Sequence, residues 1–239
     1  MGVNILGVEF DNVTMTQAAA FALELTRKRG GHYAVTPNAE ILLKTLHDAH
    51  ARNAIQSADL TLADGISVVR AAKKLGRPLK ERVAGIDFAQ NLMAACAGKR
   101  FYLLGAAEGT AEKAGVRLAE KYGIVIAGTQ NGYYADETAV LSDIRAAKPD
   151  VLFVCLGSPR QEKWMLDNRD NVGDCLMAGL GGCLDVWSGN VKRAPRLFIA
   201  LRLEWLYRLL IQPSRIGRIF ALRRFPRLVR MQRRQEKRL

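Results

Sequence analysis

Residues 58–76, ADLTLADGISVVRAAKKLG, change from a strand pattern to a helix pattern within two residues. The apolar run at 60–63 predicts a buried strand, and the apolar spacing from Ile66 onward predicts a helix. Asp64 and Gly65 separate the two. A strand that leads directly into a helix is the repeating unit of a parallel sheet, so this stretch indicates an α/β fold.

The same order of strand, turn and helix recurs up to about residue 185. Several of the strand segments are almost wholly apolar, which is typical of strands with helices on both sheet faces. We therefore predict a Rossmann-like, mainly parallel sheet flanked by helices, forming a catalytic domain over residues 1–194. Besides the opening stretch, the predicted strands cover 32–37, 100–105, 124–128, 151–157 and 175–187, and the predicted helices cover 39–58, 87–97, 136–147 and 160–168.

The net charge of +13 is concentrated at the C-terminal end of the chain. Residues 1–189 hold 21 basic and 21 acidic residues, whereas residues 190–239 hold fifteen basic and two acidic ones. Such segregation indicates that the tail meets a polyanion, which is a nucleic acid, an anionic membrane or a phosphate-bearing substrate. Apolar residues alternate with arginines here, so we predict a basic, amphipathic helical appendage over 195–239, with Ser214 capping one of its helices.

Cysteine usage and hydropathy indicate the compartment. The four cysteines form no CxxC pair and lie mostly in apolar runs, which predicts buried thiols in a reducing cytosol. The N-terminal residues lack the pattern of a secretory signal. No apolar stretch reaches the roughly 18 residues of a membrane-spanning helix. We expect a cytoplasmic or peripheral membrane protein.

Polar residues follow several predicted strands, at the edge of the sheet where parallel α/β folds bind ligands. Asp64 fits a general base, since partial burial can raise the pKa of a carboxyl group towards the working range. Alternatively, Asp64 caps the helix that begins at Ile66. Thr36 and Asn38 either bind a ligand or form a turn and a helix cap.

Three further positions have comparable alternatives. Gly105 lies in a turn that either approaches a phosphate at a helix N-terminus or only joins strand to helix. Gln161 is a candidate substrate ligand at the start of a helix. Arg82 either binds a diphosphate through its forked guanidinium or forms a surface ion pair with Glu81 or Asp87.

Metal and nucleotide-cofactor signatures are missing from the sequence. The three histidines have no pattern of acidic or cysteine partners, and no DxD-type pair is present, so we expect no metal. An oxidoreductase is disfavoured because GxGxxG is lacking. A nucleic-acid-binding protein remains the main alternative because of the basic tail, although the most basic part has few aromatic residues for base stacking.

Taken together, the motifs resemble the WecG/TagA/CpsF glycosyltransferases, also called glycosyltransferase family 26. The resemblance covers about residues 3–218 in order and spacing. Its motifs are VTPNAEIL, ADLTLADGISVV, ERVAGID, FYLLGA, PDVLFVCLGSPRQEKW and GLGGCLDVWSGNVKRAPRLFIALRLEWLYRLLIQPSR.

The resemblance implies inverting, metal-independent transfer of a sugar from a UDP-sugar to a lipid-diphosphate-linked acceptor at the cytoplasmic membrane face. Asp64 would be the catalytic base, and the other matching positions would bind substrate. The family's appendage is thought to dock on the membrane and bring arginines over the site. A homo-oligomer is compatible with this interpretation. The implied substrate-binding positions are Thr36, Asn38, Arg82 and Gln161, with Arg208, Arg215 and Arg218 from the appendage.

Overall fold

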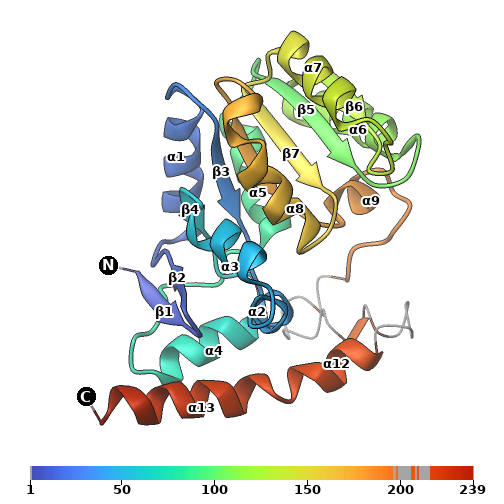
Figure 1. The fold of residues 1–239 in the computed structure, drawn as a ribbon. Helices are drawn as coiled ribbons and strands as arrows, with labels where there is room; N and C mark the ends of the chain where they lie inside the picture. The colour runs from blue at the N-terminus through green and yellow to red at the C-terminus, as the bar shows by residue number, and fades with distance from the viewer. Residues whose placement is uncertain (1, 196–197, 199–205, 208, 210–215, 239) are drawn as a thin grey trace.

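The computed structural model describes residues 2–195, 198, 206, 207, 209 and 216–238. Among them, six strands form one parallel sheet in the order β4-β3-β8-β7-β5-β6 (Figure 1). The predicted α/β class and parallel sheet are confirmed. The strands are β3 (His32–Val35), β4 (Leu60–Thr61), β5 (Arg100–Gly105), β6 (Val125–Gln130), β7 (Val151–Cys155) and β8 (Leu176–Gly179).

Helices cover both faces of this sheet, as the continuous apolar strands require. Successive strand residues point to opposite faces, so Phe101 and Leu103 enter one core cluster and Tyr102 and Leu104 the other. One face is covered by α1 (Met15–Leu25), α5 (Gly85–Ala95), α6 (Thr110–Tyr122) and α9 (Cys183–Trp187). The other is covered by α2 (Ala39–Thr45), α3 (Ala49–Gln56), α4 (Ile66–Lys74), α7 (Glu137–Ala147) and α8 (Arg160–Asp167), which a 3-10 turn at Arg169–Asn171 follows.

The four cysteines are free and buried, which confirms the prediction made from their apolar surroundings. Burial raises the pKa of the Cys96 thiol to about 11. These side chains therefore act as small apolar core residues.

Two predicted elements were wrong in extent. The helix expected over 39–58 is two helices, because α2 ends at Thr45 and Asp48 caps α3 by accepting a hydrogen bond from the Ala51 N–H at 3.0 Å. A side chain that bonds the backbone in this way ends one helix and starts another. The strand expected over 175–187 ends at Gly179, and α9 occupies its second half.

The N-terminal segment forms an antiparallel hairpin that the sequence pattern did not reveal. Its strands are β1 (Val3–Ile5) and β2 (Val8–Phe10). Leu6 and Gly7 have φ angles of 52° and 84°, the left-handed conformation of a tight hairpin turn.

The described part of the C-terminal tail consists of α12 (Ile216–Leu222) and α13 (Phe225–Glu236). Pro226 lies in the first turn of α13, where the missing N–H of proline costs no helical hydrogen bond. Figure 1 shows α13 running along α4 and the β1–β2 hairpin, and the Gln232 side chain binds the hairpin backbone through the Leu6 N–H at 2.9 Å and the Asn4 carbonyl at 3.1 Å. Most of residues 196–215, Ser214 with its expected cap among them, lie outside the described residues, and the division at residue 194 stays a prediction.

No helix in the described ranges combines the length and the apolar character needed to cross a bilayer.

Candidate active site

Thr36 joins three elements at the carboxyl edge of the sheet. It follows β3, and its buried hydroxyl donates a hydrogen bond to the Gly179 carbonyl at the end of β8, at 3.1 Å. The N-terminus of α5 approaches from the other side, since a Cβ on Gly85 would lie only 2.9 Å from Thr36 Oγ1. Thr36 therefore fixes the spacing between β3, β8 and α5.

Asn38 caps α2, which confirms one of its two expected roles. Its Oδ1 accepts hydrogen bonds from the N–H groups of Glu40 and Ile41, at 2.9 and 3.1 Å. A Cβ built on Gly65 would lie 3.4 Å from Asn38 Cβ, so the β3 and β4 loops touch here. The cap uses only the oxygen of the amide, and it holds the side chain beside the loop that carries Asp64.

Asp64 is not the cap of α4, so that alternative was wrong. The cap position belongs to Gly65, whose φ of 108° is one that L side chains rarely adopt. The glycine allows the chain to turn sharply into α4 directly after Asp64. The Asp64 carboxylate thus lies at the closing edge of the sheet with about a third of its side chain exposed (31%).

Arg82 supplies a positive charge next to Asp64. Its Nη2 lies 3.4 Å from Asp64 Oδ1, although 18 positions separate the two residues. The expected ion pairs of Arg82 with Glu81 or Asp87 were wrong. Asp87 instead pairs with Arg193 at 2.6 Å, and Glu81 accepts a hydrogen bond from a backbone N–H of α1.

Gln161 braces the loop that follows β8. It is almost wholly buried, its Oε1 accepts a hydrogen bond from the Gly181 N–H at 2.9 Å, and its Nε2 donates to Glu162 Oε1 at 3.0 Å. Glu162 is also buried, and this burial raises the pKa of its carboxyl group. The orientation of the Gln161 amide is therefore fixed from both ends.

Gly105 ends β5 on a separate part of the same edge, three strands from β3 in the order β3-β8-β7-β5. A Cβ on Gly105 would lie 2.4 Å from the Cys155 carbonyl oxygen, and its φ is 136°. Ala106 and Gly109 also have positive φ angles before α6 begins at Thr110. Only a glycine fits this close contact between β5 and β7.

The structure does not describe the side chains of the three predicted tail arginines. Arg208 and Arg215 lie outside the described residues. Arg218 lies on α12, but its side chain is not described.

With these positions established, the chain was compared with known proteins. The model of the glycosyl transferase WecG/TagA/CpsF family matches residues 3–239.

The chain belongs to this family.

Among its relatives is a Bacillus spizizenii protein that is 39% identical over 198 residues, which cover 82% of this chain and 77% of the relative. A Staphylococcus aureus (strain NCTC 8325) protein is 37% identical over 230 residues, covering 92% and 89%. Both are named N-acetylglucosaminyldiphosphoundecaprenol N-acetyl-beta-D-mannosaminyltransferase. The predicted family and the prediction of a glycosyltransferase are confirmed.

A second carboxylate lies near the carboxyl edge of the sheet and was not predicted from the sequence. Asp185 lies in α9, just beyond the carboxyl end of β8, and burial raises its pKa. It would lie 3.7 Å from a Cβ on Gly182. Asp185 was missed because residues 175–187 were predicted to form one strand. The glycine pair Gly181–Gly182 is the sequence signal that this strand ends earlier.

Two of the three histidines are paired with acids that the sequence pattern did not indicate. His32 Nδ1 lies 3.0 Å from Asp59, and His50 Nε2 lies 2.8 Å from Asp167. Within the described part of the chain, no three His, Cys, Asp or Glu side chains are grouped so that they could hold a metal ion.

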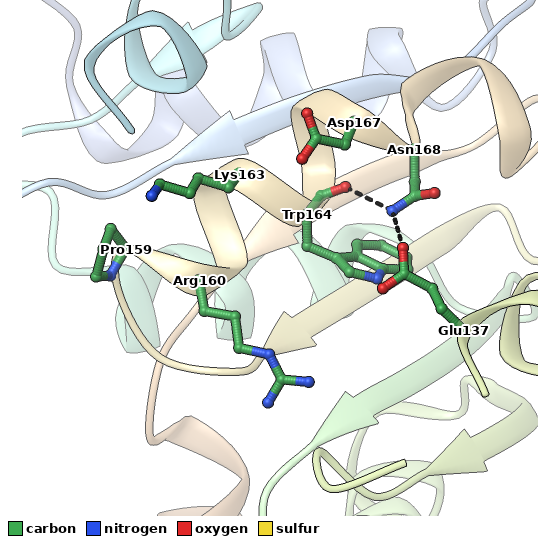
Figure 2. Close-up of a pocket in the computed structure, with 7 residues that line it drawn as sticks. All are labelled: Glu137, Pro159, Arg160, Lys163, Trp164, Asp167 and Asn168. Atoms are coloured by element: carbon green, nitrogen blue, oxygen red, sulfur yellow. Dashed lines mark hydrogen bonds between the residues drawn. The ribbon is translucent and has the colours of Figure 1, made fainter. Parts of the chain in front are cut away.

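A cavity of about 380 Å³ lies at the surface of α8, away from Asp64. Figure 2 shows the Asn168 amide bonded to the Trp164 carbonyl and the Glu137 carboxylate along its wall. Gln161 on the same helix does not line it. The cavity shares none of the predicted site residues, so the candidate active site is the carboxyl edge and not this hollow.

Proposed function

We propose that this glycosyltransferase moves a sugar from a UDP-sugar to a polyprenyl-diphosphate-linked saccharide, with inversion at the anomeric carbon. The relatives' names give the chemical classes, an N-acetylmannosaminyl group and an N-acetylglucosaminyl-diphosphate lipid. N-acetylmannosamine is therefore the first sugar to test here. The product would be an intermediate of a bacterial cell-envelope polysaccharide.

The observation that carries this proposal is the position of Asp64. It is a partly exposed carboxylate beside Thr36 and Asn38, whose side chains are fixed by hydrogen bonds to the backbone. In the proposed step, Asp64 takes the proton of the acceptor hydroxyl while that oxygen bonds to the anomeric carbon. The bond from this carbon to the UDP oxygen breaks on the opposite face, which inverts the configuration.

The departing UDP gains negative charge, which positioned donors can stabilise. We assign this role to the Arg82 guanidinium, to the backbone N–H groups of the Gly105–Thr110 turn at the start of α6, and to Gln161 as a substrate contact. With these donors in place, we propose that the reaction needs no divalent metal. Glu162 fixes the amide of Gln161 without contacting substrate.

We further propose that the basic tail brings the enzyme to the cytoplasmic face of the membrane. α13 and the residues that flank it carry a row of exposed cations, and each basic residue near an anionic surface adds about 1 kcal/mol of binding. Arg208, Arg215 and Arg218 would then reach the acceptor diphosphate. The row comprises Arg223, Arg224, Arg227, Arg230, Arg233, Arg234, Lys237 and Arg238.

The test is turnover by the full chain. A panel of UDP-sugars is offered with N-acetylglucosaminyl-diphosphate-polyprenol, and product mass and anomeric configuration are read, with Asp64→Asn as the blank. We expect one N-acetylhexosamine to be added with inversion, with and without EDTA. Retention of configuration, or loss of activity in EDTA, would contradict the mechanism.

Membrane binding is tested separately. Anionic vesicles should float the full chain, and the double variant Arg230→Glu, Arg234→Glu should float less. Binding to nucleic acid with no binding to vesicles would favour the alternative use of the tail.

A further inference from the structure

A groove of about 240 Å³ lies between α4 and the C-terminal helices. We call it the α4–α13 groove. The apolar and small side chains that line it are Ala39, Ser67, Ala71, Leu222, Phe225, Pro226 and Val229.

The groove has fixed walls. Phe225 and Val229 are 3% and 1% exposed, so the inner side of α13 is packed as a core element. Gln232 ties α13 to the N-terminal hairpin through two backbone hydrogen bonds. Arg77, after α4, and Glu236, at the end of α13, form an ion pair at 3.6 Å. The position of α13 along α4 is thus specified by several independent contacts.

One end of the groove adjoins the candidate active site. Ala39 directly follows Asn38, which caps α2, and Ser67 lies in the first turn of α4, three residues after Asp64. The loops that carry Asn38 and Asp64 touch at Gly65. The groove and the candidate site therefore share the N-termini of α2 and α4.

The charge around the groove suits a lipid with an anionic head. Arg70 and Lys74 line it beside the apolar walls, and none of the described lining residues is acidic. An apolar channel with cations along it matches a hydrocarbon chain that begins at a diphosphate. The exposed basic side of α13 forms the outside of the same wall, so the channel lies between the catalytic edge and the surface that we expect to face the membrane.

We propose that the α4–α13 groove binds the first isoprene units of the acceptor's polyprenyl chain. This inference rests on the proposed function. Leu222 and Pro226 contact the chain over the buried Phe225 and Val229, and Arg70, one turn along α4 from Ser67, neutralises charge where the diphosphate begins. The groove thereby distinguishes a polyprenyl-linked acceptor from the same saccharide on a short lipid.

The test compares two acceptors with one saccharide diphosphate, one on a full-length polyprenyl chain and one on a single isoprene unit. For the unaltered enzyme we expect KM to be at least about tenfold lower for the long chain, because several more methylene groups are buried. Ser67→Trp places a large side chain in the groove from an exposed helix position. The ratio of the two KM values should then approach one.

The matched control is Val116→Trp, on the exposed side of α6 far from the groove in sequence and fold. It should keep the chain-length ratio of the unaltered enzyme. A ratio near one in the unaltered enzyme, or an unchanged ratio in Ser67→Trp, would overturn the inference. In both cases turnover of the two acceptors would leave the proposed function standing, whereas no turnover of either acceptor would reject both.

A second measurement needs no variant and no turnover. A polyprenyl diphosphate with a photoreactive group near the head should label peptides of α4 and α13 in the full chain, and unlabelled polyprenyl diphosphate should suppress this labelling. If vesicles of photoreactive phosphatidylglycerol label the same peptides and polyprenyl diphosphate does not compete, the groove holds bulk lipid and the inference is wrong.

Discussion

Replacing Asp64 by Asn should lower the rate of sugar transfer strongly while leaving the stability of the fold almost unchanged. Asp64 pairs with Arg82 at 3.4 Å, and the two side chains are 31% and 26% exposed. A pair this accessible to water contributes about 0–1 kcal/mol to the free energy of unfolding, because solvent screens the charges. For a chain of this size, 1 kcal/mol shifts Tm by about 2–4 °C. The Asn side chain has the same shape, so we expect Tm to change by no more than that.

The effect on turnover should be far larger. A general base contributes about 10²–10⁴-fold to the rate, which corresponds to roughly 3–5 kcal/mol of transition-state stabilisation. An amide cannot accept the proton of the acceptor hydroxyl, so kcat should fall by at least about a hundredfold. The KM for the donor should change little, because the base acts on the acceptor.

Two measurements on the same protein decide this. Radiolabel transfer to the lipid acceptor gives kcat, and thermal unfolding followed by circular dichroism gives Tm. Asp167→Asn is the matched control, since Asp167 is an exposed acid in an ion pair with His50 on the outer side of α8. If Asp64→Asn keeps kcat within tenfold of the parent, or loses activity only in step with its folding, Asp64 is not the base.

Three further predictions concern the supports of the site. Burial raises the pKa of Glu162 above its ordinary 4.5, so the folded chain keeps a proton that the unfolded chain loses, and the free energy of unfolding falls as pH rises from 4.5. In urea unfolding, the free energy of unfolding of Glu162→Gln should therefore increase relative to that of the parent as pH rises. A difference that does not change with pH would contradict this. Gly179→Ala places a methyl group 3.0 Å from Gln161 Nε2 and 2.8 Å from Met165, so it should lower Tm by about 3–10 °C and reduce turnover. Gly182→Ala is the control and should not lower Tm, because a methyl group has room there. Gln232→Ala should speed amide hydrogen exchange in α13 but not in the central strands, because about 1–2 kcal/mol of the interaction between α13 and the N-terminal hairpin is lost. If the exposed control Gln235→Ala speeds exchange equally, the hydrogen bonds of Gln232 to the hairpin are unimportant.

The sheet edge was predictable because its signals are local. Thr36 and Asp64 follow apolar runs and Gly105 ends one, and a short turn leads from each into a helix, whereas Gln161 lies in the first turn of the helix that follows β7. Strand, turn and helix patterns extend over a few residues, so the sequence reports them directly. The parallel sheet then requires that all four lie at one edge, whatever the strand order.

The contacts within the site were not predictable because they join distant parts of the chain. Thr36 bonds Gly179 across 143 positions, and the order β4-β3-β8 that brings them together has no local signal. Arg82 had nearer acids to pair with in sequence, and only the folded chain directs it to Asp64. The same limit explains the α13 docking, where Gln232 bonds a hairpin 226 positions away.

Asp64 differs from Thr36 and Gln161 in its exposure to solvent, and this difference favours a catalytic role for Asp64. Thr36 and Gln161 are buried. The Thr36 hydroxyl and the Gln161 oxygen bond backbone groups of the β8 strand and loop, and the Gln161 nitrogen bonds the Glu162 carboxylate. Such groups shape a cavity but have little freedom to exchange protons with a ligand. Asp64 is partly exposed by contrast, and Gly65 lets the chain turn sharply into α4 directly after it. If Asp64 served only stability, a buried or capping position would have suited it better; an accessible carboxylate on a rigid edge suits proton transfer to a substrate that arrives from outside.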